Sequence, residues 1–303
     1  MASVWRIAYA AQMTMRIRVG HGVVLNMDCG TTESRIRDVE KGHALPQDVD
    51  FIARPPQELI GDLNEQQAQA VQYRGPALLI GAGAGSGKTR VLTRRIAWIL
   101  TQFGAWPSQV LAITFTNKAA AEMRERLGAL IGGVADRMWV STFHSACVRI
   151  LRRDGEQIGL KSGFTIYDTD DSRRLMKDCM KALNIDEKTL GHKVILSEIG
   201  RAKDSLLAPE EYAAQPTVSS DFRLKKVAQC YAVYQRRLKE ADAMDFDDLL
   251  CKTVELFTAC PDVLERYQKR YRYIMVDEYQ DTNHAQYRLI SLLAAHSGNL
   301  CVV

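Results

Sequence analysis

The sequence predicts an α/β protein built on a parallel sheet, and two features of its pattern indicate this class. From Leu63 onward, short apolar runs alternate with helical periods, as in sheets whose parallel strands are joined by helices. The first of these runs, residues 77–80, ends in a glycine-rich loop and is expected to be a strand buried on both faces. The 303 residues are 47% hydrophobic and 25% charged, the composition of a globular protein.

Further elements repeat this layout along the chain. The glycine-rich loop leads into a helix whose apolar residues Leu92, Ile96 and Ile99 recur at three- and four-residue spacing. More strands are expected at residues 110–115, 139–142, 273–276 and 300–303, with a helix at 118–130. Because the last of these strands begins where the chain stops, we expect an incomplete sheet with an unpaired edge.

A different pattern occupies residues 164–244. Strand signals disappear there and helical spacing of apolar residues dominates, for example at Leu175, Cys179 and Leu183. We therefore expect an all-helical insert at 164–244 between two segments of the sheet domain, at 57–163 and 245–303. Basic side chains gather in the insert, at Arg223, Lys225, Lys226, Arg236, Arg237 and Lys239. They form either a solvated helix face or a DNA-contacting surface.

Residues 1–56 differ from the rest of the chain. They show no sustained period, and Arg6, Arg16 and Arg18 precede the first acidic residue, Asp28. Two interpretations are open, an amphipathic targeting peptide and a disordered leader. The second is favoured because the apolar core and cleavage site of a signal sequence are missing, so we expect these residues to lie outside the fold.

Composition limits the classes of function. A net charge of +4 and a pI near 8.6 permit a nucleic-acid partner only through local patches. The seven cysteines contain no CxxC pair, which argues against a zinc ribbon or an iron–sulfur cluster and is typical of free thiols in a reducing cytoplasm. No run of 18 apolar residues is present, so a membrane-spanning helix is not expected.

The glycine-rich loop has the spacing of a P-loop placed between a strand and a helix. Its residues are Ala82, Gly83, Ala84, Gly85, Ser86, Gly87, Lys88 and Thr89. Glycines let backbone N–H groups approach phosphates, and the helix N-terminus adds partial positive charge. Lys88 is expected to reach the β- and γ-phosphates of ATP, and Thr89 to coordinate Mg²⁺. Ala82 replaces the first glycine of the strict pattern, a change that small-residue packing tolerates.

Two carboxylates follow the strand expected at 273–276. Asp277 is expected to hold Mg²⁺ through water, and Glu278 to act as general base toward the attacking water. Neighbouring residues at a strand end diverge, so the two side chains reach different sides of the phosphate. An acidic surface pair is the alternative, but the P-loop upstream favours the catalytic interpretation.

Six short motifs follow one another along the chain: LNEQQ at 63–67, AGAGSGKTR at 82–90, ITFTNKAA at 113–120, STFHS at 141–145, DFDDLL at 245–250 and DEYQDTN at 277–283. They occur in the order found in the UvrD/Rep/PcrA-type superfamily 1 DNA helicases, and the chain resembles that family. The resemblance covers residues 57–303. It implies a RecA-like ATPase domain, interrupted by a helical subdomain, that moves 3′ to 5′ along single-stranded DNA.

The resemblance also implies roles for residues in the nucleotide site. Gln67 is expected to read the adenine edge, and Arg90 belongs to the nucleotide-binding segment that begins with the P-loop. Gln280 is expected to couple the γ-phosphate to the DNA-binding segments, since a neutral amide can donate to phosphate while it accepts elsewhere.

DNA contacts follow from the resemblance as well. Phe115, Asn117, Phe143 and His144 are expected to line the strand, where an aromatic ring stacks on any base. Without the resemblance, core packing of both phenylalanines and a structural role for His144 remain open. Residues 245–250 are expected to open a helix with Phe246, Leu249 and Leu250 facing inward, a structural role only.

The family pattern continues with a Gly-Asp-x-Asp-Gln-Ser motif and a second RecA-like domain, neither of which lies within these 303 residues. We therefore expect an N-terminal fragment that carries the ATP site and part of the DNA track. Two functions remain open, an ATP-dependent DNA translocase and helicase and a nucleotide- and DNA-binding half-motor without turnover. A P-loop kinase is disfavoured. Expected partners are single-stranded DNA, duplex junctions and unidentified repair or replication proteins at the bacterial nucleoid.

Overall fold

The computed structural model describes residues 13–19, 22–27, 51–52, 54–83 and 85–303. The chain forms two compact units. Unit 1 contains the chain up to Phe143 together with Glu265–Thr282 and Ile290–Val303, and unit 2 contains His144–Leu264 and Asn283–Leu289. Unit 2 is larger than the insert expected at 164–244, because helices on both sides of that stretch belong to it.

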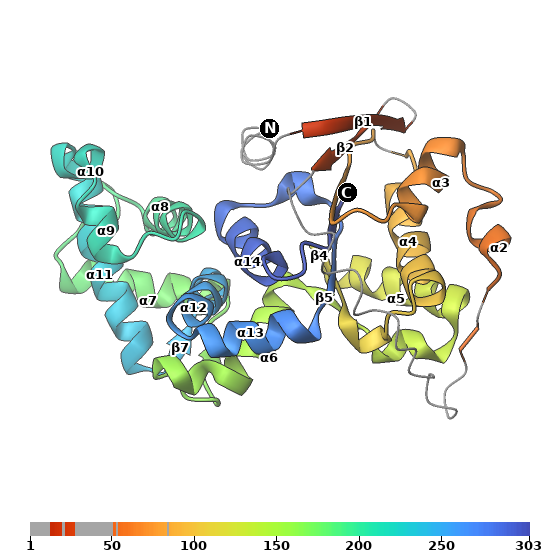
Figure 1. Cartoon of the computed structure of the whole chain (residues 1–303). Coiled ribbons are helices and arrows are strands. Elements are labelled where there is room, and N and C mark those ends of the chain that lie inside the picture. Colours follow the sequence, from red (N-terminus) through yellow and green to blue (C-terminus); the bar gives the residue numbers. More distant parts are fainter. Residues whose placement is uncertain (1–12, 20–21, 28–50, 53, 84) are drawn as a thin grey trace. The chain divides into compact units, whose positions relative to one another are not determined.

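A mixed sheet of seven strands is described in unit 1 (Figure 1). Its strands are β1 (Met13–Val19), β2 (Gly22–Met27), β3 (Ala77–Ile80), β4 (Val110–Thr114), β5 (Trp139–Thr142), β8 (Tyr273–Val276) and β9 (Leu300–Val302). They lie in the order β1-β2-β3-β9-β8-β4-β5. The five strands from β3 to β5 are parallel, as the alternating pattern predicts, and β1 and β2 are antiparallel.

Part of the expected leader belongs to the sheet. Residues 1–56 were expected to lie outside the fold, but β2 pairs with β3, from Val24 opposite Ile80 to Met27 opposite Ala77. The sequence signal was present, since two apolar runs flank Gly20 and His21 in the manner of a hairpin. Residues 1–12, 20–21 and 28–50 lie outside the described residues.

The last strand does not leave the unpaired edge that we expected. β9 lies between β3 and β8 and pairs with both in parallel. Cys301, Val302 and Val303 are buried. In contrast, β3 is buried less completely than expected, since Leu78 and Ile80 are buried while Ala77 and Leu79 are half-buried. The order of strands in space, which differs from their order in the chain, decides which strand is central.

Helices of unit 1 bury apolar faces in one core. They are α2 (Pro56–Ile60), α3 (Glu65–Gln72), α4 (Lys88–Gln102) and α5 (Asn117–Ile131). Leu92, Ile96 and Ile99 of α4 are fully buried, which confirms the predicted face. On α5 the buried residues are Ala120, Met123, Leu127 and Ile131. These residues recur at three- and four-residue spacing and form one apolar face of the helix.

Unit 2 is mainly helical. Its helices are α6 (Phe143–Asp154, whose first residue belongs to unit 1), α7 (Thr169–Ala182), α8 (His192–Asp204), α9 (Pro209–Ala213), α10 (Pro216–Ser220), α11 (Phe222–Glu240) and α12 (Phe246–Ala259). β6 (Thr165–Ile166) and β7 (Ala243–Met244) form a short parallel pair. The boundary between the units falls within α13 (Pro261–Arg270) and α14 (His284–Ala294).

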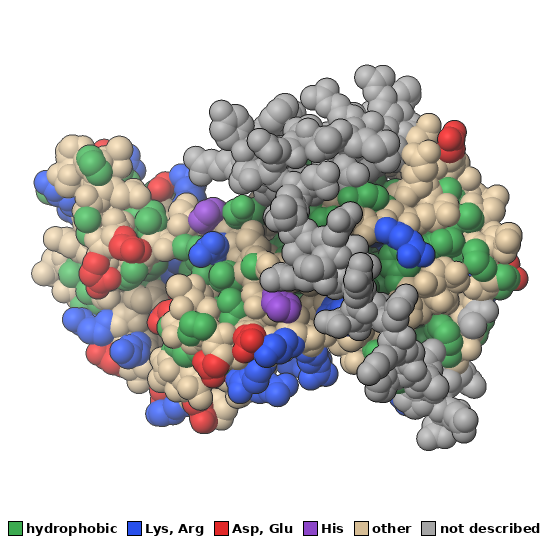
Figure 2. Space-filling model, in the orientation of Figure 1, with side chains coloured by type: hydrophobic (Ala, Val, Ile, Leu, Met, Phe, Trp, Pro, Cys, Tyr) green, Lys and Arg blue, Asp and Glu red, His purple; other side chains and the backbone are tan. Residues whose placement is uncertain are grey.

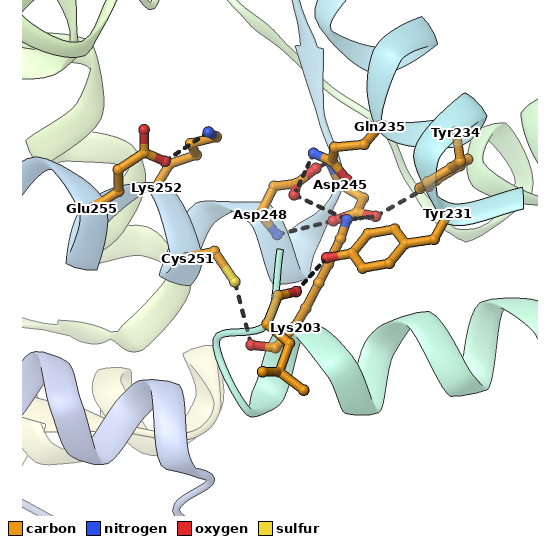
Figure 3. Close-up of polar contacts among 10 residues, drawn as sticks. Lys203, Tyr231, Tyr234, Gln235, Asp245, Asp248, Cys251, Lys252 and Glu255 are labelled. Carbon is orange, nitrogen blue, oxygen red and sulfur yellow. Dashed lines mark hydrogen bonds and ion pairs between the residues drawn. The ribbon is translucent and has the colours of Figure 1, made fainter. Parts of the chain in front are cut away.

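A buried lysine joins α8 to the start of α12 (Figure 3). The Lys203 side chain is 1% exposed, and its Nζ lies 2.6 Å from Oδ2 of Asp245 and 2.9 Å from Oδ1 of Asp248. Tyr234 donates to Asp245 over 3.1 Å, and Gln235 donates to Asp248 over 2.8 Å. Burial by itself lowers the pKa of Lys203, but the two carboxylates outweigh it and hold that pKa above its ordinary value.

The DFDDLL segment begins a helix, as predicted. Asp245 is the N-cap of α12, and its side chain and that of Asp248 form a reciprocal capping box. Leu249 and Leu250 are buried, but Phe246 is 47% exposed, so the expectation that it faces inward is wrong. Its ring lies edge-on to the His144 ring, with centroids 5.8 Å apart, instead of entering the core.

Candidate nucleotide-binding site

The predicted motifs follow the carboxyl ends of parallel strands, which share one edge of the sheet. The P-loop follows β3, Phe115 follows β4 and Asp277 follows β8. Ligands of open α/β sheets bind at this edge, where loops and helix N-termini converge. The sheet topology therefore brings segments that are distant in sequence to one site in unit 1.

The loop after β3 has the backbone that a phosphate cradle requires. Gly85 and Gly87 have φ of 74° and 80°, a left-handed conformation that residues with a Cβ rarely adopt. Ser86 Oγ donates to the Gly83 carbonyl over 2.6 Å, which closes the loop on itself. α4 begins at Lys88 and has no acidic residue in its first turn, so its N-terminal N–H groups favour an anion. Predicted residue Ala84 lies outside the described residues.

Lys88 folds back over the loop that precedes it. Its Nζ donates to the carbonyl oxygens of Ala82 and Gly83, over 3.1 Å and 3.5 Å. These contacts hold the ammonium beside the backbone that would surround the phosphates. A compact, mobile ammonium in this position can serve as the cation for the outer phosphates.

Thr89 and Asp277 meet although they lie 188 positions apart in sequence. The Thr89 hydroxyl donates to Oδ2 of Asp277 over 3.0 Å. Burial raises the pKa of Asp277, while the bond from Thr89 acts in the opposite direction. A hydroxyl and a carboxylate are hard oxygen ligands of the kind that Mg²⁺ takes together with phosphate oxygens and water. The predicted pair of metal ligands is thus adjacent in space.

Glu278 has a strained backbone. Its φ of 54° and ψ of 39° lie in the left-handed region, which costs a residue with a Cβ roughly 1–2 kcal/mol. Gln280 donates its amide N–H to the Glu278 carboxylate through a short hydrogen bond. Such strain is typical of active sites. Asp277 accepts a hydrogen bond from Thr89 and Glu278 accepts one from Gln280, so the two neighbouring carboxylates have different partners.

Gln67 lies against the P-loop. Its Nε2 donates to the Ser86 carbonyl over 3.0 Å, and its Oε1 accepts from the backbone N–H of Asn64 over 3.2 Å. The latter bond is half of a capping box at the start of α3. Arg90, predicted in the nucleotide-binding segment, donates to the Asp62 carbonyl over 3.0 Å and pairs with its carboxylate. Arg90 therefore holds the segment before α3.

The two phenylalanines predicted to contact DNA differ in exposure. Phe115 is half-buried and Asn117 is exposed, but Phe143 is only 1% exposed. The Phe143 ring meets Phe115 edge-on, with centroids 5.5 Å apart. A buried ring offers no face to a base, so the prediction that Phe143 stacks on DNA is wrong. Core packing beside a strand, the alternative left open by the sequence, describes Phe143, which supports the Phe115 ring from behind.

His144 belongs to unit 2 and is half-buried there. Burial lowers its pKa, and the Asp204 carboxylate offsets part of this effect. Asp204 also accepts a hydrogen bond of 2.5 Å from the Asn283 side chain. Sequence reasoning missed Asp204, which has no motif around it, whereas Asn283 is the last residue of the DEYQDTN motif.

The basic residues expected in the insert lie on α11. Arg223, Lys225, Arg236 and Lys239 are exposed. Arg236 lies 3.7 Å from Glu240, one helical turn away. Figure 2 shows Lys and Arg side chains interspersed with Asp and Glu over this part of unit 2. The intermixed charges favour the solvated helix face over a DNA-contacting surface.

Known proteins include a family and several relatives that match this chain. The model of the UvrD/REP helicase N-terminal domain matches residues 63–303. The chain belongs to this family. It is 50% identical over 257 residues to ATP-dependent DNA helicase UvrD1 of Mycobacterium tuberculosis, covering 82% of this chain and 33% of the relative. It is also 49% identical over 245 residues to ATP-dependent DNA helicase PcrA of Staphylococcus aureus, and this match covers 81% of this chain and 33% of the relative.

The chain thus spans about a third of the length of the curated relatives it matches. All six predicted motifs fall within the matched region, with the first beginning at its first residue, Leu63. Among the helices of the described residues, none has the length and apolar character needed to cross a membrane.

Proposed function

We propose that this chain is the ATP-binding front part of a motor that moves 3′ to 5′ along single-stranded DNA and separates duplex strands. The contact between Thr89 and Asp277 carries the proposal. It joins the P-loop helix to the acidic end of β8 at hydrogen-bond distance, although nothing in the local sequence requires these segments to meet. Family membership supports the same activity.

Mg²⁺ fits the residues present. Thr89 supplies a hydroxyl and Asp277 a buried carboxylate, and the two oxygens lie 3.0 Å apart. Mg²⁺ usually takes one or two protein oxygens and completes its shell with phosphates and water. When bound, the ion would neutralise charge on the phosphates. The chain's own contribution is to hold the two oxygen ligands at the mouth of the P-loop.

Glu278 is the proposed general base. Its carboxylate can take a proton from the water that attacks the γ-phosphate, and Gln280 holds that carboxylate through its amide. The remaining N–H of Gln280 stays available to a phosphate oxygen. With a nucleotide bound, Gln280 would contact both the base and the phosphate, which supports its proposed role in relaying the state of the nucleotide.

Phe115 and Asn117 are the proposed strand contacts of unit 1, and His144 that of unit 2. Phe115 keeps part of its ring exposed, with Phe143 behind it, so a base can stack on it without sequence preference. Single-stranded DNA and duplex junctions are the proposed substrates, in the bacterial cytoplasm at the nucleoid. Repair or replication proteins are the proposed class of protein partner.

A nucleotide- and DNA-binding half-motor without turnover is the second candidate. The nucleotide-site residues that the structure brings together, Lys88, Thr89 and Asp277, account for the binding of a nucleotide with Mg²⁺ and not by themselves for its turnover. Phosphoryl transfer needs several cations around the γ-phosphate, and an arginine finger is worth about 10³ to 10⁵ in rate. The family resemblance attributes those arginines to a second RecA-like domain.

The two candidates separate in one set of measurements on the full chain. Calorimetry with ATP and Mg²⁺ should detect binding, and Lys88→Ala should weaken it at least about tenfold because it removes the phosphate cation. Lys181→Ala, on the exposed surface of α7, is the matched control. Steady-state ATP hydrolysis that is stimulated by single-stranded DNA would indicate a motor. Binding of ATP without hydrolysis would indicate a half-motor. Equal ATP affinity in Lys88→Ala and the parent would reject the P-loop assignment.

A further inference from the structure

Arg95 is a buried arginine on α4, two turns after the phosphate-binding lysine. It is 5% exposed, and its Nη1 donates to the carbonyl oxygens of Ala70, Val71 and Tyr73, over 2.9, 3.2 and 2.9 Å. These carbonyls form the C-terminal end of α3, where the helix has no donors of its own left. A guanidinium at this position also meets the negative end of the helix dipole. Arg95 therefore fastens α3 to α4.

The other polar contacts near these segments are more exposed. Arg94 lies 3.2 Å from the Asp62 carboxylate, ahead of α3, and Arg90 pairs with the same group. The Asp62 side chain is 54% exposed, and ion pairs in such positions contribute little. The bonds from Arg95, two of them buried, are thus the principal polar tie that sets where α3 lies on α4.

The position of α3 decides the orientation of the Gln67 amide. Gln67 is on the first turn of α3, and its side chain spans from its own helix to the P-loop. Its Oε1 accepts from the Asn64 N–H, and its Nε2 donates to the Ser86 carbonyl. An amide has two N–H donors and an oxygen with two lone pairs. One N–H and one lone pair therefore remain for a ligand, with their positions fixed.

This remaining pair matches adenine and not guanine. The outer edge of adenine presents an acceptor at N7 and a donor at N6, which a glutamine amide can engage together. Guanine presents two acceptors, N7 and O6, so one of them faces the Gln67 oxygen. If the Gln67 amide is no longer bonded to Ser86, it can rotate and direct both N–H groups at guanine. The preference for adenine over guanine then falls.

We propose that Arg95 is a positioning residue for nucleobase choice. By holding α3 on α4 it keeps Gln67 bonded to Ser86, and so makes the site prefer adenine to guanine nucleotides. This inference rests on the proposed ATP site and adds the determinant of its base specificity. Lys88 and Thr89 belong to α4 itself, so we expect the phosphate-binding part of the site to depend less on the position of α3, which contacts the P-loop through Gln67 and Ser86.

The test compares three ligands on the full chain: ATP, GTP and inorganic tripolyphosphate, each with Mg²⁺. Calorimetry gives the three affinities for the parent, Arg95→Met and Arg95→Lys. We expect the parent to prefer ATP to GTP by about tenfold or more, the usual range for a bidentate base contact. In Arg95→Met the ratio should fall to within about threefold, with tripolyphosphate affinity unchanged. Arg95→Lys should give an intermediate ratio, because an ammonium keeps the charge but lacks the planar fork.

Arg124→Met is the matched control, since Arg124 also donates to a backbone carbonyl, that of Val140 over 2.7 Å, but lies on α5. It should keep the parent's ratio. The inference is overturned if Arg95→Met keeps the parent's ratio of ATP affinity to GTP affinity. If Arg95→Met does not fold, the same result in a folded Arg95→Lys overturns it. The inference is also overturned if the affinity for tripolyphosphate falls as much as the affinity for ATP. Arg95 would then stabilise unit 1 as a whole. A parent that binds neither ATP nor tripolyphosphate overturns the proposed function itself.

Discussion

Thr89 donates a hydrogen bond of 3.0 Å to Asp277, and this contact joins the P-loop helix to the end of β8. Both residues follow parallel strands of one sheet, and β8 is separated from β3 only by β9. The pair unites two motifs that the sequence presents 188 positions apart. Its chemistry, a hydroxyl beside a buried carboxylate, suits Mg²⁺ more than any basic partner.

Asp277→Asn should remove most of the contribution of Mg²⁺ to ATP affinity, because an amide keeps the bond from Thr89 but is a poor ligand for a hard cation. ATP binding measured in EDTA should change little. Asp262→Asn, on the exposed start of α13, is the control for charge removal. If Mg²⁺ increases the ATP affinity of the variant as much as that of the parent, Asp277 is not a metal ligand.

Glu278→Gly should be more stable than Glu278→Ala by about 0.5–1 kcal/mol. Both variants lose the carboxylate and its bond with Gln280, so the comparison isolates the backbone, whose φ of 54° suits glycine better than alanine. Urea unfolding gives the difference, and both variants should bind ATP without hydrolysing it. Equal stability of the two would mean that the turn relaxes once the glutamate is removed.

Phe115→Ala and Phe143→Ala should differ in kind. Loss of the Phe115 ring should weaken binding of an oligothymidine by about 1–3 kcal/mol, with little change in the free energy of unfolding. Loss of the buried Phe143 ring should destabilise the fold by about 3–5 kcal/mol. Fluorescence anisotropy and urea unfolding measure the two effects. If a folded Phe115→Ala variant binds DNA as tightly as the parent, the Phe115 ring has a packing role like that of Phe143.

Lys203→Met should destabilise unit 2 by about 3–5 kcal/mol, because it leaves Asp245 and Asp248 buried without a cation. Adding Asp245→Asn and Asp248→Asn should recover most of the loss, since asparagine still caps α12. Urea unfolding of the single and triple variants checks this. A triple variant as unstable as Lys203→Met would show that the lysine acts through packing.

Asp247→Asn should stabilise unit 2 at pH 7.5 by about 1–2 kcal/mol, allowing for partial exposure, and have no effect near pH 4. Burial, helped by the Asp245 charge, raises the pKa of Asp247 to about 6. The folded chain therefore holds this proton more tightly than the unfolded chain. Ionisation costs stability above pH 6, and the cost disappears as the pH falls toward the unfolded pKa. Urea unfolding of parent and variant at both pH values gives the difference, and a pH-independent difference would contradict this account.

Local chemistry allowed much of the site to be predicted. The P-loop depends on glycines at fixed spacing, and Gly85 and Gly87 adopt the left-handed angles that this spacing requires. The apolar face of α4 and the cap of α12 at Asp245 also follow from residues within one or two helical turns. Such features are set by near neighbours in the chain, so a pattern of a few residues is enough to predict them.

Contacts between distant segments were decided only by the tertiary structure. Phe143 has the same aromatic character as Phe115, yet one ring is buried behind the other. β9 comes last of the described strands in sequence but lies between β3 and β8. Lys203 and Arg95 look like surface residues in a helix pattern until their partners, 42 and up to 25 positions away, enclose them. Burial and pairing depend on which segments meet in space, and the free energy of that packing belongs to the whole fold and not to any short stretch of sequence.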